Sequence, residues 1–382
     1  MTVEQDFLVH TGPAGVLPDG RDDFAVVLGP PGTTSSLVMT RSRTAGPCVT
    51  LSRETRRGAA RGVVVLARNA NVATGEQGYR DAVEIQDRVA QVVGTGADEL
   101  VFCSTGVIGR RYPMEPIRAH LDALTWPPTG GSVGDAAAAM MTTDTHPKVH
   151  RGSGDGFEVV GIAKGVGMIE PDMATMLSFV MTDAAIDADT LEQVWHRVVA
   201  RTYNSVSIDG DTSTSDTALV LASGRAGPVD AAALEEVLLE VCTAIVKDIA
   251  SDGEGASTLI TCTVTGAASA EQAKRVGKSV INSPLVKTMV HGADPNWGRV
   301  VMAVGKCMDD TDITTEKLTV SFGGDESYPR EPDEAVLAGI EQHLTGDEVL
   351  IGVDLGIGRE SWTVYGCDLT EGYIRVNADY TT

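Results

Sequence analysis

Aromatic residues are scarce in this chain of 382 residues and make up only 4% of it. Aliphatic side chains and Met must therefore fill the interior, because hydrophobic residues still account for 42% of the sequence and charged residues for 22%. These proportions are typical of a globular protein and exclude a disordered or fibrous one. At roughly 150 residues per domain, the length predicts two or three structural units or one large layered fold.

Basic residues are also few, since 30 Lys and Arg stand against 53 Asp and Glu and give a formal charge of −23. Phosphate backbones and anionic lipids repel such a chain, which argues against nucleic acid or a membrane surface as a partner. Long apolar runs are missing, and short pieces such as residues 62–67 cannot span a bilayer. The charge itself names no substrate, because a solvated acidic surface explains it equally well.

Cysteine pairs at metal-ligand spacing are absent. No CxxC pair occurs, and none of the seven histidines stands at zinc-finger spacing or within HExxH, so no metal is expected. The six cysteines lie far apart, at Cys48, Cys103, Cys242, Cys262, Cys307 and Cys367. Residues 1–10 carry Glu4 and Asp6 where a signal peptide has basic residues before an apolar core. These features predict a reduced, cytoplasmic protein.

Common nucleotide-binding and hydrolase motifs are missing as well. No GxSxG nucleophile elbow occurs, and Gly277-Lys278-Ser279 lacks the glycine five residues earlier that a phosphate loop requires. Residues 209–213 begin like a calcium loop, but the Gly and Glu needed later are replaced. GSGDG at 152–156 lacks the GxGxxG spacing and predicts a hairpin turn. These motifs therefore give no support to a phosphate loop, a calcium loop, a dinucleotide fingerprint or an α/β-hydrolase.

Strand-like runs alternate with amphipathic segments, which predicts an α/β protein. A good N-cap at Asp230 and the pair Ser283-Pro284 each indicate the start of a helix. Helices are expected at about 79–93, 231–251, 284–291 and 334–344. Strands are expected at 63–67, 100–104, 159–163, 176–182, 218–222, 259–264, 300–304 and 350–355. Residues 362–369 and 373–376 are expected to pair as two C-terminal strands.

The stretch most suggestive of chemistry is GIAKGVGMIEPDMATMLSFVMT at residues 161–182. Here a glycine-rich loop leads to Ala174 and to Thr175 at the start of an apolar strand, a position that suits an N-terminal nucleophile. The Thr175 hydroxyl would attack the Ala174 carbonyl, the peptide would shift to an ester, and water would cut the chain. The freed α-amine, with a reference pKa of about 7.7–8.0, could then activate the hydroxyl as a base. Ala-Thr before a strand is also common in ordinary cores.

KGVGMIEPDMATML within this stretch resembles the processing-site signature of the ornithine acetyltransferases, also called glutamate N-acetyltransferases, of the N-terminal-nucleophile-like group. The resemblance continues in collinear order through VVVLARNANVATG at 63–75, STGVIGR at 104–110, MTTDT at 141–145, SIDGDTSTSDTA at 207–218, KDIASDGEGA at 247–256, INSPLVKTMVHGADPNWGRVVMAVG at 281–305 and GCDLTEGYIRVNADYTT at 366–382. It implies an α/β layered sandwich, self-cleaved between Ala174 and Thr175. The α-chain of residues 1–174 and the β-chain of residues 175–382 would share one core.

The resemblance also implies a reaction. An acetyl group would pass from N2-acetylornithine to glutamate by a ping-pong mechanism through an acetyl-enzyme on Thr175, releasing ornithine and N-acetylglutamate in the acetyl-recycling route to arginine. No cofactor is implied, and relatives assemble as dimers of the cleaved pair. Glu170 and Asp172, ahead of the cut, differ from the small or amide residues of many relatives. Use of acetyl-coenzyme A, and whether ornithine serves arginine or a specialised product, stay open.

The site residues implied by the resemblance lie far apart in the sequence. Thr105 and Gly106 would stabilise the oxyanion of the tetrahedral intermediate. The substrate-binding positions implied are Thr142, Thr143, Lys164, Thr175, Glu254, Asn377 and Thr382, with the choice between Thr142 and Thr143 open. Without the resemblance, each position has an ordinary interpretation: a strand-ending turn, a solvated lysine, a polar helix terminus or a frayed tail.

Two other functions are compatible with the sequence. An aminopeptidase or amidase of the same structural group would give its acyl group to water, so the partition between glutamate and water separates it from a transferase. A non-catalytic small-molecule binding protein would stay uncut and would tolerate Thr175→Ala.

Overall fold

The computed structural model describes residues 2–170 and 176–379, so Ala174, Thr175 and Thr382 lie outside the described residues. The helices, 3-10 helices included, are η1 (Val3–Asp6), α1 (Pro47–Ser52), α2 (Gly75–Val93), η2 (Ala97–Glu99), α3 (Met114–Ala123), α4 (Val133–Ala139), α5 (Ala188–Arg201), η3 (Tyr203–Ser205), α6 (Ala231–Ser251), α7 (Ala270–Ile281), α8 (Pro284–His291), α9 (Trp297–Val304), α10 (Glu334–Leu344) and α11 (Glu371–Asp379). The strands are β1 (Leu8–Gly12), β2 (Phe24–Leu28), β3 (Thr34–Met39), β4 (Gly62–Leu66), β5 (Leu100–Ser104), β6 (Lys148–Gly154), β7 (Phe157–Lys164), β8 (Leu177–Ala185), β9 (Val206–Ser207), β10 (Thr217–Pro228), β11 (Leu259–Ala267), β12 (Thr319–Phe322), β13 (Asp325–Tyr328), β14 (Glu348–Asp354) and β15 (Glu360–Cys367).

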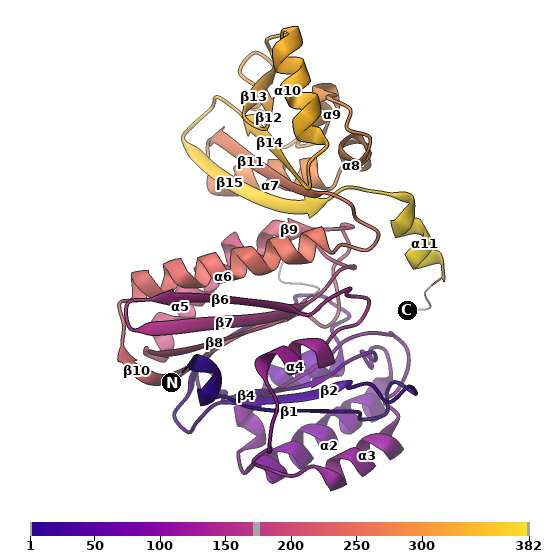
Figure 1. The fold of residues 1–382 in the computed structure, drawn as a ribbon, viewed down its shortest axis with the longest axis vertical. Coiled ribbons are helices and arrows are strands. Elements are labelled where there is room, and N and C mark those ends of the chain that lie inside the picture. The colour runs from indigo at the N-terminus through magenta and orange to yellow at the C-terminus, as the bar shows by residue number, and fades with distance from the viewer. Residues whose placement is uncertain (1, 171–175, 380–382) are drawn as a thin grey trace.

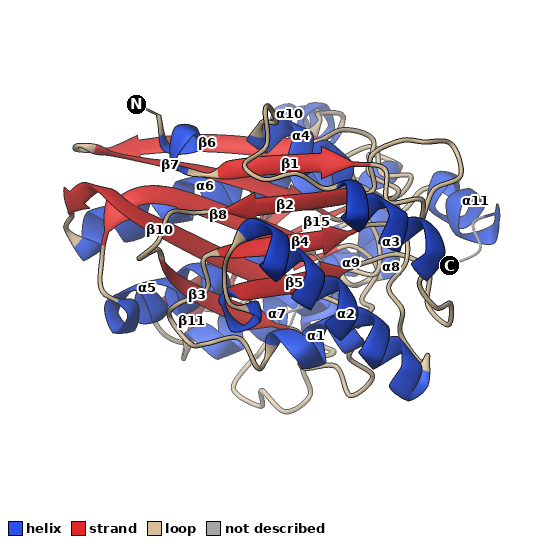
Figure 2. Cartoon of the chain, turned by 90° about the horizontal axis from the view of Figure 1, so that it is seen from below, coloured by secondary structure: helices blue, strands red, loops and turns tan. Residues whose placement is uncertain are grey.

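The strands form three sheets. The first has the order β1-β2-β4-β5, the second β3-β10-β8-β7-β6, and the third β13-β12-β14-β11-β15-β9. Figure 1 shows them as successive layers, with α2 and α3 below the first sheet, α6 above the second, and the third sheet at the top. Figure 2, seen from below, shows α1, α2 and α3 in front of the first sheet.

The first two sheets pack face to face because their strands are apolar on alternating positions. In β8, Leu177, Phe179 and Met181 face the first sheet and share a core with it. Val180 and Ala184, on the opposite face of β8, pack with α5 and α6. The outer face of the first sheet packs on α1, α2 and α3. The result is a four-layer helix–sheet–sheet–helix sandwich, and the predicted α/β layered sandwich is confirmed.

The third sheet belongs to a C-terminal unit with its own core, formed with α7, α8, α9 and α10. Its central strands β11 and β14 are parallel, and β15 runs antiparallel to β11. At its outer edge β15 pairs with the two-residue strand β9, and through β9 this unit joins the layered sandwich. Among the described helices, none combines the length and apolar character needed to cross a membrane.

Most of the predicted elements are confirmed within a few residues, but two are wrong. Residues 300–304 lie in helix α9, where Val300, Ala303 and Val304 are buried on one face at helical spacing. Residues 373–376 lie in helix α11. A strand had been expected to pair with β15, but β15 already pairs with β11 on one side and β9 on the other, so it offers no free edge there. The hairpin turn predicted at 152–156 connects β6 and β7.

Candidate active site

One small cavity, of about 90 Å³, collects the predicted site residues that the structure describes. They come from the end of β5, the end of β7, the loop after α4, the loop after α6, and α11. Its lining includes Thr105, Gly106, Thr142, Thr143, Lys164, Glu254 and Asn377. These seven positions span more than 270 residues of sequence, so only the folded chain brings them together. The loops at this end of the sheets lie near α11 in Figure 2.

Directly after the undescribed residues 171–175, the chain bonds to the segment that follows residues 213–215. Met176 is the first described residue there, and its carbonyl accepts a hydrogen bond from the Thr217 N–H at 3.0 Å. Ser213, Thr214 and Ser215, just before Thr217, line the cavity. The described chain therefore resumes beside the hydroxyl-rich wall of the cavity, one residue after the position predicted for the nucleophile.

Thr105 and Gly106 follow β5, and both line the cavity. Gly106 has φ of +129°, and a Cβ atom there would lie 2.2–2.6 Å from backbone atoms of Arg68, so only glycine fits. The neighbouring Val107 N–H donates to the Arg68 carbonyl at 3.2 Å and holds the two segments together. The Gly106 N–H and the Thr105 hydroxyl have no hydrogen-bond partner among the described residues. They are therefore available to a developing oxyanion.

Lys164 places a buried positive charge in the cavity. It is the last residue of β7 and only 5% exposed. No described carboxylate oxygen lies within 4.0 Å of its Nζ, the limit for an ion pair. Burial is the main cause that lowers the pKa of Lys164, and Asp144 nearby opposes this shift. A buried ammonium without an ion-pair partner favours an anionic ligand, because a carboxylate would supply the missing counter-charge.

Glu254 places a negative charge in the same cavity and is held from both sides. Its Oε1 accepts the Thr143 hydroxyl at 2.8 Å, and its Oε2 accepts the Asn377 side-chain amide at 2.9 Å. Its backbone N–H donates to the Val166 carbonyl at 2.8 Å. The Thr142 N–H instead donates to Asp144. Thr143 is therefore the threonine that contacts Glu254, although both threonines line the cavity.

A buried ion-pair network centred on Lys148 holds together the loops that line the cavity. The fully buried Lys148 pairs with Asp144 at 3.0 Å and with Asp252 at 2.7 Å. Asp144 also accepts the N–H groups of Thr142 at 3.0 Å and Gly165 at 2.7 Å. Burial opposes the ionisation of Asp144, but the neighbouring lysines and these two donors outweigh it and lower its pKa to about 2. One ammonium group thus connects the loops that carry the threonines, Lys164 and Glu254.

Some cavity residues were not predicted as site residues. Ser213, Thr214 and Ser215 belong to a block that the sequence identified only as a hydroxyl-rich turn. Their clustering directly after Asp209-Gly210 was the available signal. Asp209 accepts the backbone N–H groups of Met168 and Ile169 at 2.7 and 2.8 Å and thereby holds the glycine-rich loop. In residues 2–170 and 176–379, no three His, Cys, Asp or Glu side chains are arranged to hold a metal ion.

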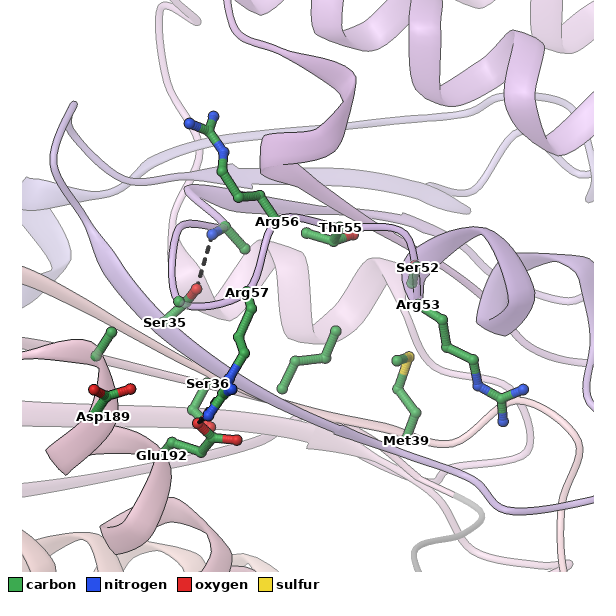
Figure 3. Close-up of a pocket in the computed structure, with 14 residues that line it drawn as sticks. Ser35, Ser36, Met39, Ser52, Arg53, Thr55, Arg56, Arg57, Asp189 and Glu192 are labelled. Atoms are coloured by element: carbon green, nitrogen blue, oxygen red, sulfur yellow. Dashed lines mark hydrogen bonds and ion pairs between the residues drawn. The ribbon is translucent and has the colours of Figure 1, made fainter.

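A larger cavity, of about 360 Å³, lies between β3, the loop after α1 and the start of α5 (Figure 3). Its arginines already have acidic partners or backbone contacts. Arg57 points to Glu192 and pairs with it, Arg56 pairs with Glu99, and the Arg53 guanidinium donates to the Thr40 carbonyl at 2.9 Å. None of the predicted site residues lines this cavity. The smaller cavity, whose lysine and two donors have no such partner in the part of the chain that the structure describes, is therefore the candidate active site.

Comparison with known proteins covers nearly the whole chain. A family model described as the ArgJ family matches residues 9–382. Glutamate N-acetyltransferase Oat2 of Streptomyces clavuligerus is 58% identical, and the alignment covers 98% of this chain and 97% of that protein. The arginine biosynthesis bifunctional protein ArgJ of Rhodococcoides fascians is 55% identical, with 99% and 94% covered. A crystal structure of the ArgJ protein of Bacillus halodurans is 37% identical and covers 52% of this chain and 96% of its own, with a TM-score of 0.48.

Proposed function

Because this chain belongs to the ArgJ family, we propose that it transfers an acetyl group from N2-acetylornithine to glutamate through an acetyl-enzyme on Thr175. The proposal rests on the residues that line the cavity of about 90 Å³. It contains a buried ammonium with no ion-pair partner among the described residues, a carboxylate held by two hydrogen bonds, and two oxyanion donors that bond to no described residue. An acyltransferase acting on zwitterionic amino acids requires each of these groups.

The first half-reaction forms the acetyl-enzyme. The Thr175 hydroxyl oxygen adds to the acetyl carbonyl carbon of N2-acetylornithine, and its proton passes to the Thr175 α-amine. The carbonyl oxygen becomes an oxyanion, which the Thr105 hydroxyl and the Gly106 N–H stabilise. The carbon–nitrogen bond then breaks, the α-ammonium returns the proton to the departing nitrogen, and ornithine leaves. The acetyl group stays on Thr175 as an ester.

The second half-reaction runs the same steps toward the other substrate. The α-amine of glutamate adds to the ester carbonyl, the same two donors stabilise the oxyanion, and N-acetylglutamate leaves as the Thr175 oxygen regains a proton. No metal or cofactor takes part in this scheme. Both substrates carry an α-carboxylate, which suits Lys164, and ornithine also carries a side-chain ammonium, which suits Glu254.

Cleavage between residues 174 and 175 would leave two pieces that share one core. The second sheet supports this proposal, because β10 and β8 from the second piece lie between β3 and β7 from the first. The ladder between β7 and β8 alone contains six paired positions, from Val159 with Thr182 to Lys164 with Leu177. The cleaved chains would therefore stay together, and a dimer of this pair is the proposed assembly. The six cysteines are all free thiols, which fits the proposed cytoplasmic location.

The transferase is tested by following ornithine release from N2-acetylornithine with and without glutamate. We expect release to depend on glutamate, equal amounts of N-acetylglutamate to form, and double-reciprocal plots at several glutamate concentrations to be parallel, since the mechanism is ping-pong. An aminopeptidase or amidase would instead release acetate at a rate that glutamate does not change. That result would replace the transferase with a hydrolase.

Replacing Lys164 by methionine tests the carboxylate contact. We expect the KM for N2-acetylornithine and for glutamate to rise roughly ten- to a hundredfold, because a hydrogen bond to a charged group contributes about 1.5–3 kcal/mol. Lys306→Met, at an exposed lysine, should leave both KM values unchanged. Steady-state kinetics on the three proteins measures the effect. Unchanged KM values in folded Lys164→Met would exclude this role.

A further inference from the structure

A second cavity, of about 130 Å³, adjoins the candidate active site and shares Glu254 with it. Three further charged residues line it, namely Asp209, Lys287 and Asp368. It lies where the C-terminal unit, through α8 and the end of β15, meets the loops of the layered sandwich. Nothing in the sequence singled out this cavity.

Lys287, on α8, is the unusual member of the lining. It is only 5% exposed, and Ser283 and Pro284 at the start of α8 fix the helix that carries it. Its Nζ donates to the backbone carbonyl of Cys367 and lies 3.9 Å from the Cys367 sulfur. No described carboxylate lies within 4.0 Å of this Nζ. A buried ammonium is costly without a counter-charge, so the cavity favours an anionic group beside Lys287.

The two aspartates of the cavity keep their negative charge, but structural hydrogen bonds hold each of them in place and neither lies within 4.0 Å of the Lys287 ammonium. Asp209 accepts two backbone N–H groups of the glycine-rich loop at 2.7 and 2.8 Å. Asp368 accepts the N–H groups of residues 257 and 258 at 2.8 and 3.1 Å and contacts the His291 ring at 3.1 Å. Glu254, held by Thr143 and Asn377, is the acidic residue that this cavity shares with the candidate active site, and Lys287 is the one basic residue among the described lining.

The proposed reaction requires both a positive and a negative group where the substrate side chain binds. The two substrates share an α-carboxylate and an α-nitrogen, but the side chain of ornithine ends in an ammonium and that of glutamate in a carboxylate. A side-chain subsite with one sign of charge would repel one of them. In the proposed function Lys164, in the first cavity, binds the α-carboxylate that both substrates share. The substrate side chain would then extend past Glu254 into the second cavity.

We propose that Lys287 binds the side-chain carboxylate of the glutamate acceptor, so that the Glu254–Lys287 cavity forms a side-chain subsite that accepts either charge. This inference rests on the proposed function and adds to it a residue that selects the acceptor. The ornithine side chain uses Glu254, whereas the glutamate side chain uses Lys287. Neutral side chains of similar length gain neither contact.

The test compares two reactions of the same acetyl-enzyme in Lys287→Met, Lys287→Gln and the parent. The first is transfer of acetyl to glutamate, and the second is exchange of labelled ornithine into N2-acetylornithine, which needs no glutamate. We expect the KM for glutamate to rise roughly ten- to a hundredfold in both variants, far more than any change in ornithine exchange. The preference for glutamate over glutamine as acceptor should fall by a similar factor, since only glutamate has the side-chain charge.

Controls separate this role from a structural one. Lys247→Met removes a lysine that pairs with Glu348 outside both cavities, and it should leave both reactions unchanged. Lys287→Gln keeps a donor for the Cys367 carbonyl and guards against a folding defect of the methionine variant. Equal losses of exchange and transfer, or an unchanged preference for glutamate over glutamine, would overturn the proposal. Absence of ornithine exchange in the parent would instead contradict the proposed function itself.

Discussion

The Thr175→Ala variant of this protein is expected to remain a single chain of 382 residues and to lose acetyl transfer by roughly 10⁴-fold or more. Alanine has no hydroxyl to attack the peptide bond before it, so neither cleavage nor the acetyl ester can form. Intact mass under denaturing conditions reports the cleavage, and ornithine release from N2-acetylornithine reports the transfer. The parent should give pieces of residues 1–174 and 175–382.

Thr175→Ser is the matched control for this variant, because serine keeps a hydroxyl at the same position. It should still be cut, with transfer reduced far less than in the alanine variant. A Thr175→Ala protein that is cut at the same bond, or that still transfers acetyl at the parental rate, would remove Thr175 from the mechanism.

Gly106→Ala is expected to lower kcat by roughly 10²–10³-fold, the effect of losing one oxyanion donor. Its added Cβ would lie 2.2 Å from the Arg68 carbonyl carbon, where backbone rather than a flexible side chain must move. The φ of +129° is also one that alanine rarely adopts. The Gly106 N–H would therefore shift away from the oxyanion position. Single-turnover formation of the acetyl-enzyme measures the effect directly.

Gly156→Ala separates backbone strain from loss of the donor. Gly156 also has a positive φ, of +81°, but it lies in the turn between β6 and β7, and an added Cβ would meet no atom within 4 Å. Its substitution should lower stability modestly and leave kcat unchanged. A folded Gly106→Ala protein with parental kcat would show that this N–H does not stabilise the transition state.

Much of the fold could be predicted because local signals agreed with the final packing. Residues 100–104 form a strand and residues 334–344 a helix at the predicted bounds, since a short apolar run and a good N-cap at Asp333 define them locally. Residues of α9 and α11 were predicted as strands, and helices α1, α3, α4, α5 and α7 were not predicted. The valine-rich run in α9 has β-branched residues typical of strands, and only its packing in the C-terminal core favours a helix. Sequence could not show that β15 has no free edge for a further strand.

The candidate site, like the fold, was predicted only in part. The family resemblance identified Thr105, Gly106, Lys164, Glu254 and Asn377, which the fold brings to one cavity. The resemblance did not distinguish Thr142 from Thr143. In the fold, the Thr142 N–H bonds to Asp144 and the Thr143 hydroxyl bonds to Glu254, and sequence alone does not show these contacts. Lys287 lies within the block 281–305 that carries the resemblance but was assigned no role, since its burial depends on a carbonyl eighty residues away in β15. Such residues are found only from long-range contacts.

The acetyl-enzyme on Thr175 can be observed by its mass. The parent protein is incubated with N2-acetylornithine, quenched in denaturant and examined by mass spectrometry with fragment sequencing. We predict that the piece beginning at Thr175 gains one acetyl group on the Thr175 oxygen, and that adding glutamate before the quench removes it. A chain that is never cut, or an acetyl group found on another residue, would exclude Thr175 as the nucleophile that carries the acetyl group.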